Sequence, residues 1–84
     1  MRCLLVYDIS NDNVRYKVAD ACLDYGLDRI QYSAFFGQLS RTYQKELMKK
    51  VRVLLGDEAG NVQLFPLCQN DWQKRDVIIQ EKKK

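Results

Sequence analysis

Residues 3–9 read CLLVYDI, and this short run decides the fold. It is apolar on both alternating faces as far as Asp8, which is typical of a strand in the middle of a sheet. A carboxylate at the end of such a strand is costly unless something binds it. Asp8 is therefore the first candidate for a function, and two roles are open: bracing the polar turn that follows, or binding a hard cation.

The residues on either side of this strand predict two helices. The polar cluster SNDN, residues 10–13, favours a turn in which Asp12 is the N-cap of a helix that ends at Gly26. A second helix is expected between a cap at Ser40 and a stop at Gly56. Each has one apolar stripe at helical spacing, namely Val14, Val18, Ala21, Cys22 and Tyr25 in the first and Tyr43, Leu47, Val51 and Leu54 in the second.

Between the helices, residues 27–39, LDRIQYSAFFGQL, alternate as a strand does, long enough to be bent or split into a hairpin. Residues 61–68, NVQLFPLC, predict a further strand, at an edge or near a strand end because of Pro66. Residues 77–79, VII, form a short apolar run with no local partner. In the long segment we expect a dry face with Ile30, Tyr32, Ala34 and Phe36, and a mixed face with Arg29, Gln31, Ser33 and Phe35.

This order of elements predicts one α+β domain over residues 1–84, a ferredoxin-like βαββαβ sandwich. Two helices cover only one face of its antiparallel sheet. The other face, with Phe35 on it, is expected to be covered by a second copy, which makes the protein a homodimer. The C-terminal segment, residues 70–84, is expected to pair with the partner subunit.

Composition narrows the class of protein. The net charge is +3 and the estimated pI about 8.8, which permits a nucleic-acid partner without requiring one. The chain has no His, and its three cysteines are widely spaced in apolar surroundings, so we expect no zinc site and three buried thiols. No signal peptide or membrane span is recognisable, and we expect a soluble, cytoplasmic protein.

Several side chains are suited to phosphate chemistry. Mg²⁺ often uses only one or two protein carboxylates, so two copies of Asp8 near a two-fold axis are able to hold it. Arg15 and Lys17 lie in the first turns of the first helix and can bind phosphate, although Lys17 can also simply pair with Asp20. Arg29 and Phe35 on one sheet face suit either a nucleic-acid contact or a dimer interface.

Three stretches together resemble one family: VYDISNDNVRYKVA (residues 6–19), YGLDRIQYSAFFG (residues 25–37) and NVQLFPL (residues 61–67). They are similar to the small CRISPR-associated protein of the second type, the dimeric partner of the spacer-acquisition integrase. The resemblance runs from Met1 to about Leu67. It implies a ferredoxin-like homodimer in which symmetric aspartates face each other and Asp8 binds Mg²⁺, or another divalent cation such as Mn²⁺.

The resemblance also implies a site and an activity. Tyr7 and Asp8 match catalytic positions, although Tyr7 by its place in the strand is expected in the core or an interface. Arg15, Lys17, Arg29 and Phe35 match the nucleic-acid-binding positions, with Lys where some relatives have Arg at position 17.

The leading hypothesis is a metal-dependent endonuclease of the spacer-acquisition stage of antiviral defence, which hydrolyses RNA, with double-stranded DNA as a further substrate class. The alternatives are a non-catalytic adaptor that bridges integrase dimers and binds DNA, and an RNA-binding module that shares only the fold.

Overall fold

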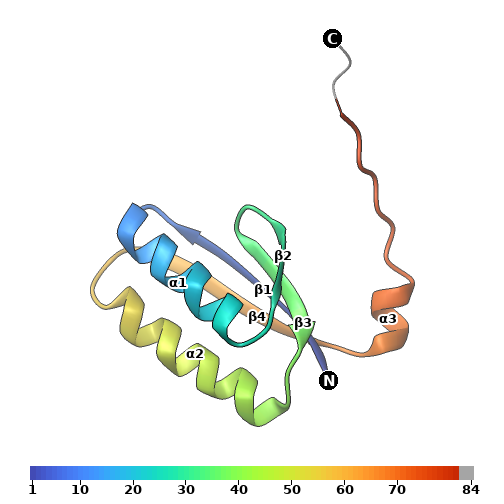
Figure 1. The fold of residues 1–84 in the computed structure, drawn as a ribbon, viewed down its shortest axis with the longest axis horizontal. Helices are drawn as coiled ribbons and strands as arrows, with labels where there is room; N and C mark the ends of the chain where they lie inside the picture. Colours follow the sequence, from blue (N-terminus) through green and yellow to red (C-terminus); the bar gives the residue numbers. More distant parts are fainter. Residues whose placement is uncertain (82–84) are drawn as a thin grey trace.

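The computed structural model describes residues 1–81, and it confirms the α+β class and the βαββαβ order. A four-stranded sheet has the order β2-β3-β1-β4, with every neighbouring pair antiparallel, and α1 and α2 lie side by side over one of its faces (Figure 1). The elements are β1 (Arg2–Ile9), α1 (Asp12–Asp24), β2 (Asp28–Gln31), β3 (Ala34–Gln38), α2 (Arg41–Leu55), β4 (Gly60–Leu67) and a short α3 (Gln69–Gln73).

The central strand β1 supplies the core, as its sequence predicts. Its odd-numbered side chains point under the helices and are buried, whereas its even-numbered side chains face the uncovered side of the sheet. The buried set is completed from both helices and from β3. Its members include Cys3, Leu5, Tyr7, Ile9, Val18, Cys22, Leu27, Phe35, Leu47 and Val51.

The helix boundaries agree with the sequence, but two predicted details are wrong. The N-cap of α1 is Asn11, whose Oδ1 accepts a hydrogen bond of 3.0 Å from the Val14 N–H, and not Asp12, which instead pairs with an arginine in the next turn. In α2, Tyr43 is exposed and Gln44 takes its place in the core. Gln44 is tolerated there because its Nε2 donates to the Leu39 carbonyl at 3.0 Å, so the buried amide is not left unpaired.

Residues 27–39 form a hairpin, one of the two shapes expected. The prediction of which side chains face the helices is wrong: Phe35 is fully buried beneath them, opposite Leu5, and Phe36 lies on the uncovered face, opposite Leu4. The register also shifts between Arg29 and Gln31. Hydrophobicity alone misassigned the faces because both faces of this sheet are apolar.

The strand β4 lies at an edge of the sheet, and Pro66 near its end is accommodated there as predicted. The chain then turns, so Cys68 is exposed and its Sγ accepts from the Asp71 N–H, in contrast to the buried thiol expected. Cys3 and Cys22 are buried, as expected.

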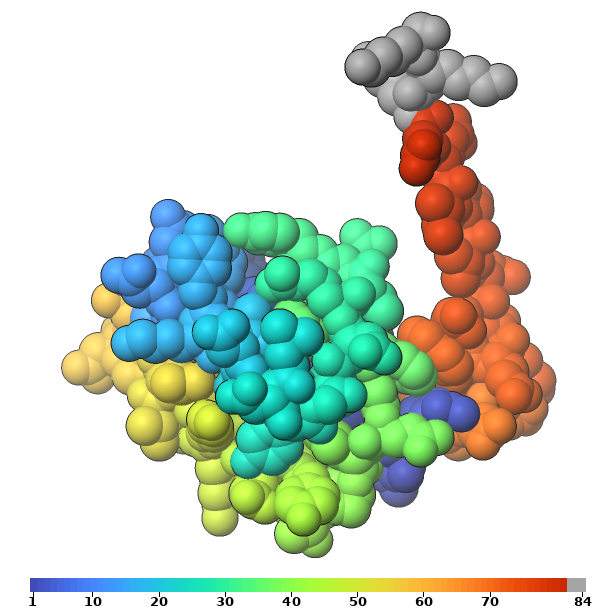
Figure 2. Space-filling model, viewed as in Figure 1, coloured from blue at the N-terminus to red at the C-terminus, as the bar shows by residue number. Residues whose placement is uncertain are grey.

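The short helix α3 is attached to the uncovered sheet face by stacking. The Trp72 ring lies on the Phe36 ring with centroids 3.5 Å apart, and the Arg75 guanidinium lies 4.0 Å from the centre of the Trp72 ring. Beyond it the chain leaves the body as an extended tail (Figure 2), in which Ile78 and Ile79 are 89% and 87% exposed. Residues 77–79 form no strand in the single chain, and the last three residues of the predicted 70–84 segment lie outside the described residues.

Candidate metal and nucleic-acid site

Asp8 lies on the uncovered face of the sheet, near the end of the central strand β1. Because Tyr7 and Ile9 on either side of it point into the core, the strand alternation directs the Asp8 carboxylate to solvent. Its neighbour across the ladder is Asn61 of β4, whose Oδ1 accepts from Gln63 Nε2 at 3.0 Å. Asp8 and Asn61 therefore place two oxygen-bearing side chains next to each other on an open surface.

The alternative role for Asp8, bracing the following turn, belongs to other residues. Asn11 caps the helix, and Arg15 Nη1 donates to the Ile9 carbonyl at 3.0 Å and to the Ser10 carbonyl at 3.5 Å. Within residues 1–81 the Asp8 carboxylate has neither a hydrogen bond nor an ion pair. An exposed, uncommitted carboxylate beside a carboxamide suits a hard cation, which prefers oxygen ligands.

One chain alone does not complete such a site. No group of three or more His, Cys, Asp or Glu side chains in the described part of the chain could hold a metal ion. Asp8 and Asn61 supply at most two protein ligands, and Mg²⁺ accepts so few only when water, substrate phosphate or a second subunit completes its octahedron. The donors present fit a divalent cation that is shared with another molecule.

The predicted phosphate-binding arginines gather at a different place, the tip of the β2–β3 hairpin. Tyr32 is 64% exposed there, with the Arg15 and Arg29 guanidinium carbons 5.6 and 5.8 Å from the centre of its ring. Burial disfavours the charged form of Arg15, but its hydrogen bonds and charge interactions with Asp12 and Tyr32 outweigh this effect and raise its pKa. This cluster therefore keeps two cations beside an exposed aromatic ring.

Two of the predicted site residues form the floor below this cluster and do not face solvent. Tyr7 and Phe35 are stacked with centroids 6.1 Å apart, and both are buried on the helix side of the sheet. The Arg29 guanidinium lies 5.0 Å from the centre of the Phe35 ring, so Phe35 positions Arg29. The expectation that Arg29 and Phe35 share a face is confirmed, but that face is the one under the helices.

Three further residues near the site are exposed, and the sequence left one open, misplaced another and did not indicate the third. Lys17 is exposed on α1, and it forms no ion pair with Asp20 within residues 1–81. Tyr32, predicted on the dry face of the strand, is exposed because it lies in the hairpin turn at residues 32–33. Asn61 was not selected, since only the β1–β4 register brings it beside Asp8.

The fold agrees with comparisons to known proteins. A family model described as CRISPR associated protein Cas2 matches residues 1–75. The chain belongs to the Cas2 family. One relative, from Chloroflexus aurantiacus and named CRISPR-associated endoribonuclease Cas2 2, is 51% identical over 81 residues, which cover 96% of this chain and 95% of the relative.

Two other members of the Cas2 family are informative. The crystal structure of Cas2 from Streptococcus pyogenes has a TM-score of 0.79 at 19% identity, covers 93% of this chain and 99% of its own, and supports the ferredoxin-like fold. A Thermoproteus tenax protein named CRISPR-associated endonuclease Cas1/endonuclease Cas2 fusion is 38% identical over 65 residues, which are 77% of this chain and 25% of the fusion. No helix within residues 1–81 is long and apolar enough to cross a membrane.

Proposed function

We propose that this chain is a CRISPR-associated endoribonuclease that acts as a homodimer and uses a divalent cation held between two copies of Asp8. The observation that carries the proposal is the uncommitted Asp8 carboxylate on an uncovered sheet face, in a family whose relatives are named endoribonucleases. Asp8 is exposed, but it belongs to β1, the most deeply packed strand. The packing of that strand therefore fixes where the Asp8 side chain lies.

The proposed dimer is supported by apolar surface that one chain leaves uncovered. On the open sheet face Phe65 is 43% exposed, and Leu4 and Val6 beside it are only partly buried. Trp72 covers the Phe36 end of this face and leaves the Asp8 end free. The extended tail presents two isoleucines to water, and among residues 1–81 the edge strand β4 has a neighbour on one side only. A second copy that adds its tail to β4 as a further strand covers the two isoleucines and pairs the open edge of β4.

In this arrangement each residue has a separate task. Asp8 and Asn61 would hold the cation, which when bound would lower the pKa of water and neutralise charge on the phosphoryl oxygens. Arg15 is anchored to the backbone of Ile9, one residue beyond Asp8, and Arg29 is held on Phe35; their remaining N–H groups bind the phosphates of the substrate strand. Tyr32 offers a ring on which a base of single-stranded RNA can stack.

The test is substitution of the carboxylate by its amide. Asp8→Asn keeps the size of the side chain and is expected to abolish cation-dependent RNA cleavage while leaving the dimer intact, because the residue is exposed. Asp28→Asn is the matched control: Asp28 is an exposed aspartate on the same sheet face, in β2 opposite Phe36. Equal cleavage by the wild type and Asp8→Asn, or equal loss in both variants, would show that Asp8 holds no catalytic ion.

A second function, that of an adaptor for the integrase in spacer acquisition, is favoured by the relative in which Cas1 and Cas2 form one polypeptide. In that role the dimer binds Cas1 and DNA, and the Asp8 carboxylate is dispensable. Measuring RNA cleavage and spacer uptake with the same Asp8→Asn variant distinguishes the two functions. A variant that lacks cleavage but still supports spacer uptake would show that the protein acts as an adaptor in the cell. Loss of both would assign spacer uptake to the catalytic site.

A further inference from the structure

A pocket of about 610 Å³ lies between the end of α1 and the beginning of α2, which share one end of the helix layer (Figure 1). Its lining includes two aromatic rings and two carboxylates, and we call it the tyrosine pocket: Tyr25, Tyr43, Asp24 and Glu46. The buried Leu39 adds apolar surface. Among residues 1–81 none of its lining residues belongs to β1, β4 or the tail, so the proposed dimer leaves this pocket open.

The ends of the two helices hold the tyrosines in place. Where α1 ends, the Tyr25 N–H donates to the Ala21 carbonyl at 3.1 Å. Where α2 begins, the Tyr43 N–H donates to Ser40 Oγ at 3.1 Å. The Tyr43 ring is 55% exposed, so it is accessible to another molecule. Backbone hydrogen bonds therefore fix the positions from which both aromatic side chains enter the pocket.

Tyr25 also orients one of the carboxylates. Its hydroxyl donates to Glu46 Oε1 at 3.4 Å. Burial raises the pKa of the Tyr25 phenol, and the charge and hydrogen bond of Glu46 raise it further, with an added effect of the nearby Tyr43. The phenol is therefore protonated near neutral pH and remains a donor. Glu46 has no other hydrogen bond among residues 1–81, which leaves its second oxygen free for a ligand.

The negative charge of the tyrosine pocket is not neutralised within the described part of the chain. The one ion pair among residues 1–81 joins Arg15 and Asp12, so neither Asp24 nor Glu46 has a cationic partner there. Even Lys50, one turn along α2 from Glu46, forms no ion pair with it. In a chain with a net charge of +3, two unpaired carboxylates beside a hollow attract a cation.

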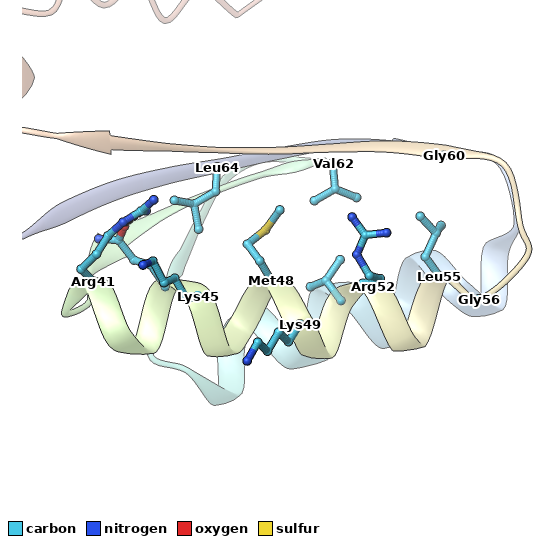
Figure 3. Close-up of a pocket in the computed structure, with 12 residues that line it drawn as sticks. Arg41, Lys45, Met48, Lys49, Arg52, Leu55, Gly56, Gly60, Val62 and Leu64 are labelled. Carbon is cyan, nitrogen blue, oxygen red and sulfur yellow. Dashed lines mark hydrogen bonds between the residues drawn. The ribbon is translucent and has the colours of Figure 1, made fainter.

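The distribution of charge on the two helices also favours a cationic ligand. Glu46 is the one acidic residue of α2, and it lines the tyrosine pocket. Three cations of the same helix, Arg41, Lys45 and Arg52, lie toward β4 instead (Figure 3). Asp24 ends α1, whose last turn has no basic residue, although a carboxylate is unfavourable at this negative end of a helix. Such a departure from a local preference is expected where a residue serves binding and not folding.

The lining distinguishes between the possible cations. A guanidinium is planar and more weakly hydrated than an ammonium, and it stacks on aromatic faces. Its N–H groups form a rigid fork that matches a carboxylate, so one guanidinium contacts a ring and an acid at once. The tyrosine pocket supplies both partners in Tyr43 and Glu46. The ammonium group of a lysine or a polyamine has no planar face for the ring, so arginine fits this lining best.

We propose that the tyrosine pocket binds an arginine side chain of a partner protein. The guanidinium stacks on the Tyr43 ring and donates to the free oxygen of Glu46. The Asp24 carboxylate stabilises the same positive charge, and the aliphatic part of the arginine packs against Leu39. The pocket is separate from the Asp8 site, and the proposal rests neither on cleavage nor on nucleic-acid binding.

The test adds acetyl-arginine amide to isotope-labelled protein and follows the backbone amide resonances of residues 24–26 and 39–46 by NMR. A single side chain should bind with a dissociation constant on the order of 1 mM. Acetyl-citrulline amide is the matched ligand, because it keeps the shape of arginine without its charge. The arginine compound should shift these resonances, and the citrulline compound should leave them in place.

The variants separate the contributions of charge and ring. Glu46→Gln keeps an acceptor for Tyr25 and removes the charge, and Tyr43→Ala removes the exposed ring. Each should weaken binding by about 2–5-fold. Asp24→Asn should weaken binding as well, but raise the Tm by about 1–8 °C, because it removes a charge from the wrong end of α1. Asp20→Asn is the matched control, an exposed aspartate of α1 outside the pocket, and should leave the affinity unchanged.

Several results would overturn the assignment. One is equal binding of the citrulline compound, and another is an equal loss of affinity in Asp20→Asn and Glu46→Gln. Tighter binding of spermidine than of the arginine compound would assign the tyrosine pocket to a polyamine. Shifts of the same resonances with protein concentration alone would assign it to a second copy. Stronger binding after removal of residues 82–84 would assign it to the lysines of the chain itself.

Discussion

Replacing Phe35 by alanine distinguishes a packing role from a nucleic-acid contact. The sequence leaves two roles open for this ring, a nucleic-acid contact and a dimer interface, whereas the structure buries it completely, beside Tyr7 and beneath Arg29. Truncating a buried Phe to Ala costs about 3–5 kcal/mol, since transfer and cavity terms add. At roughly 0.05–0.15 kcal/mol per residue, a domain of this size has a free energy of unfolding of about 4–13 kcal/mol. Phe35→Ala should therefore remove a large share of the stability.

The assay is urea unfolding, followed by the fluorescence of the single tryptophan and by far-UV circular dichroism at one fixed protein concentration, because a dimer's stability depends on concentration. Tyr32→Ala is the control: this ring is exposed, and its two contacts with arginine are worth about 0.5–1 kcal/mol each. Tyr32→Ala should reduce the free energy of RNA binding by more than it reduces the free energy of unfolding.

The reasoning is refuted if Phe35→Ala unfolds within about 0.5 kcal/mol of the wild type, the range of an ordinary surface change, and still loses RNA binding. Phe35→Leu keeps an apolar group in the core and guards against a variant that simply fails to fold. It should lose less stability than the alanine variant and should bind RNA as the wild type does.

Four further outcomes are expected from the structure. Asn11→Ala removes the cap of α1 and should lower the free energy of unfolding by about 1 kcal/mol in a thermal melt. Ile78→Asp/Ile79→Asp places charges in the exposed tail and should shift the proposed dimer toward monomer in sedimentation; unchanged association would exclude the tail from the interface. Burial raises the pKa of the Cys22 thiol to about 12 from a usual value of 9.0, so a thiol reagent near neutral pH should modify only the exposed Cys68 in the native protein. For the same reason Cys22 favours folding fully below about pH 9, and this contribution is lost as the pH rises toward 12.

Much of the candidate site could be predicted from local signals. Asp8 ends an apolar run, and its exposure follows from simple alternation once β1 is known to be central. Arg15 and Arg29 could also be predicted as phosphate-binding residues, but their setting could not, because the alternation of residues 27–39 does not reveal the turn at residues 32–33 that brings Tyr32 beside both. Lys45 and Arg52 lie off the apolar stripe predicted for the second helix, and only the packing of α2 against β4 shows that they line a groove.

By itself the sequence determined the order of helices and strands, the ends of both long helices, and the class of fold, since periodicity and capping depend on residues close together in the chain. Only the tertiary structure decided which face of β3 is buried and which side chains meet across the sheet. The reason is that Phe35 and Phe36 are equally apolar and adjacent, and the choice between them depends on register with Leu5 and Leu4 in a strand some thirty residues away. Local hydrophobicity carries no information about that register.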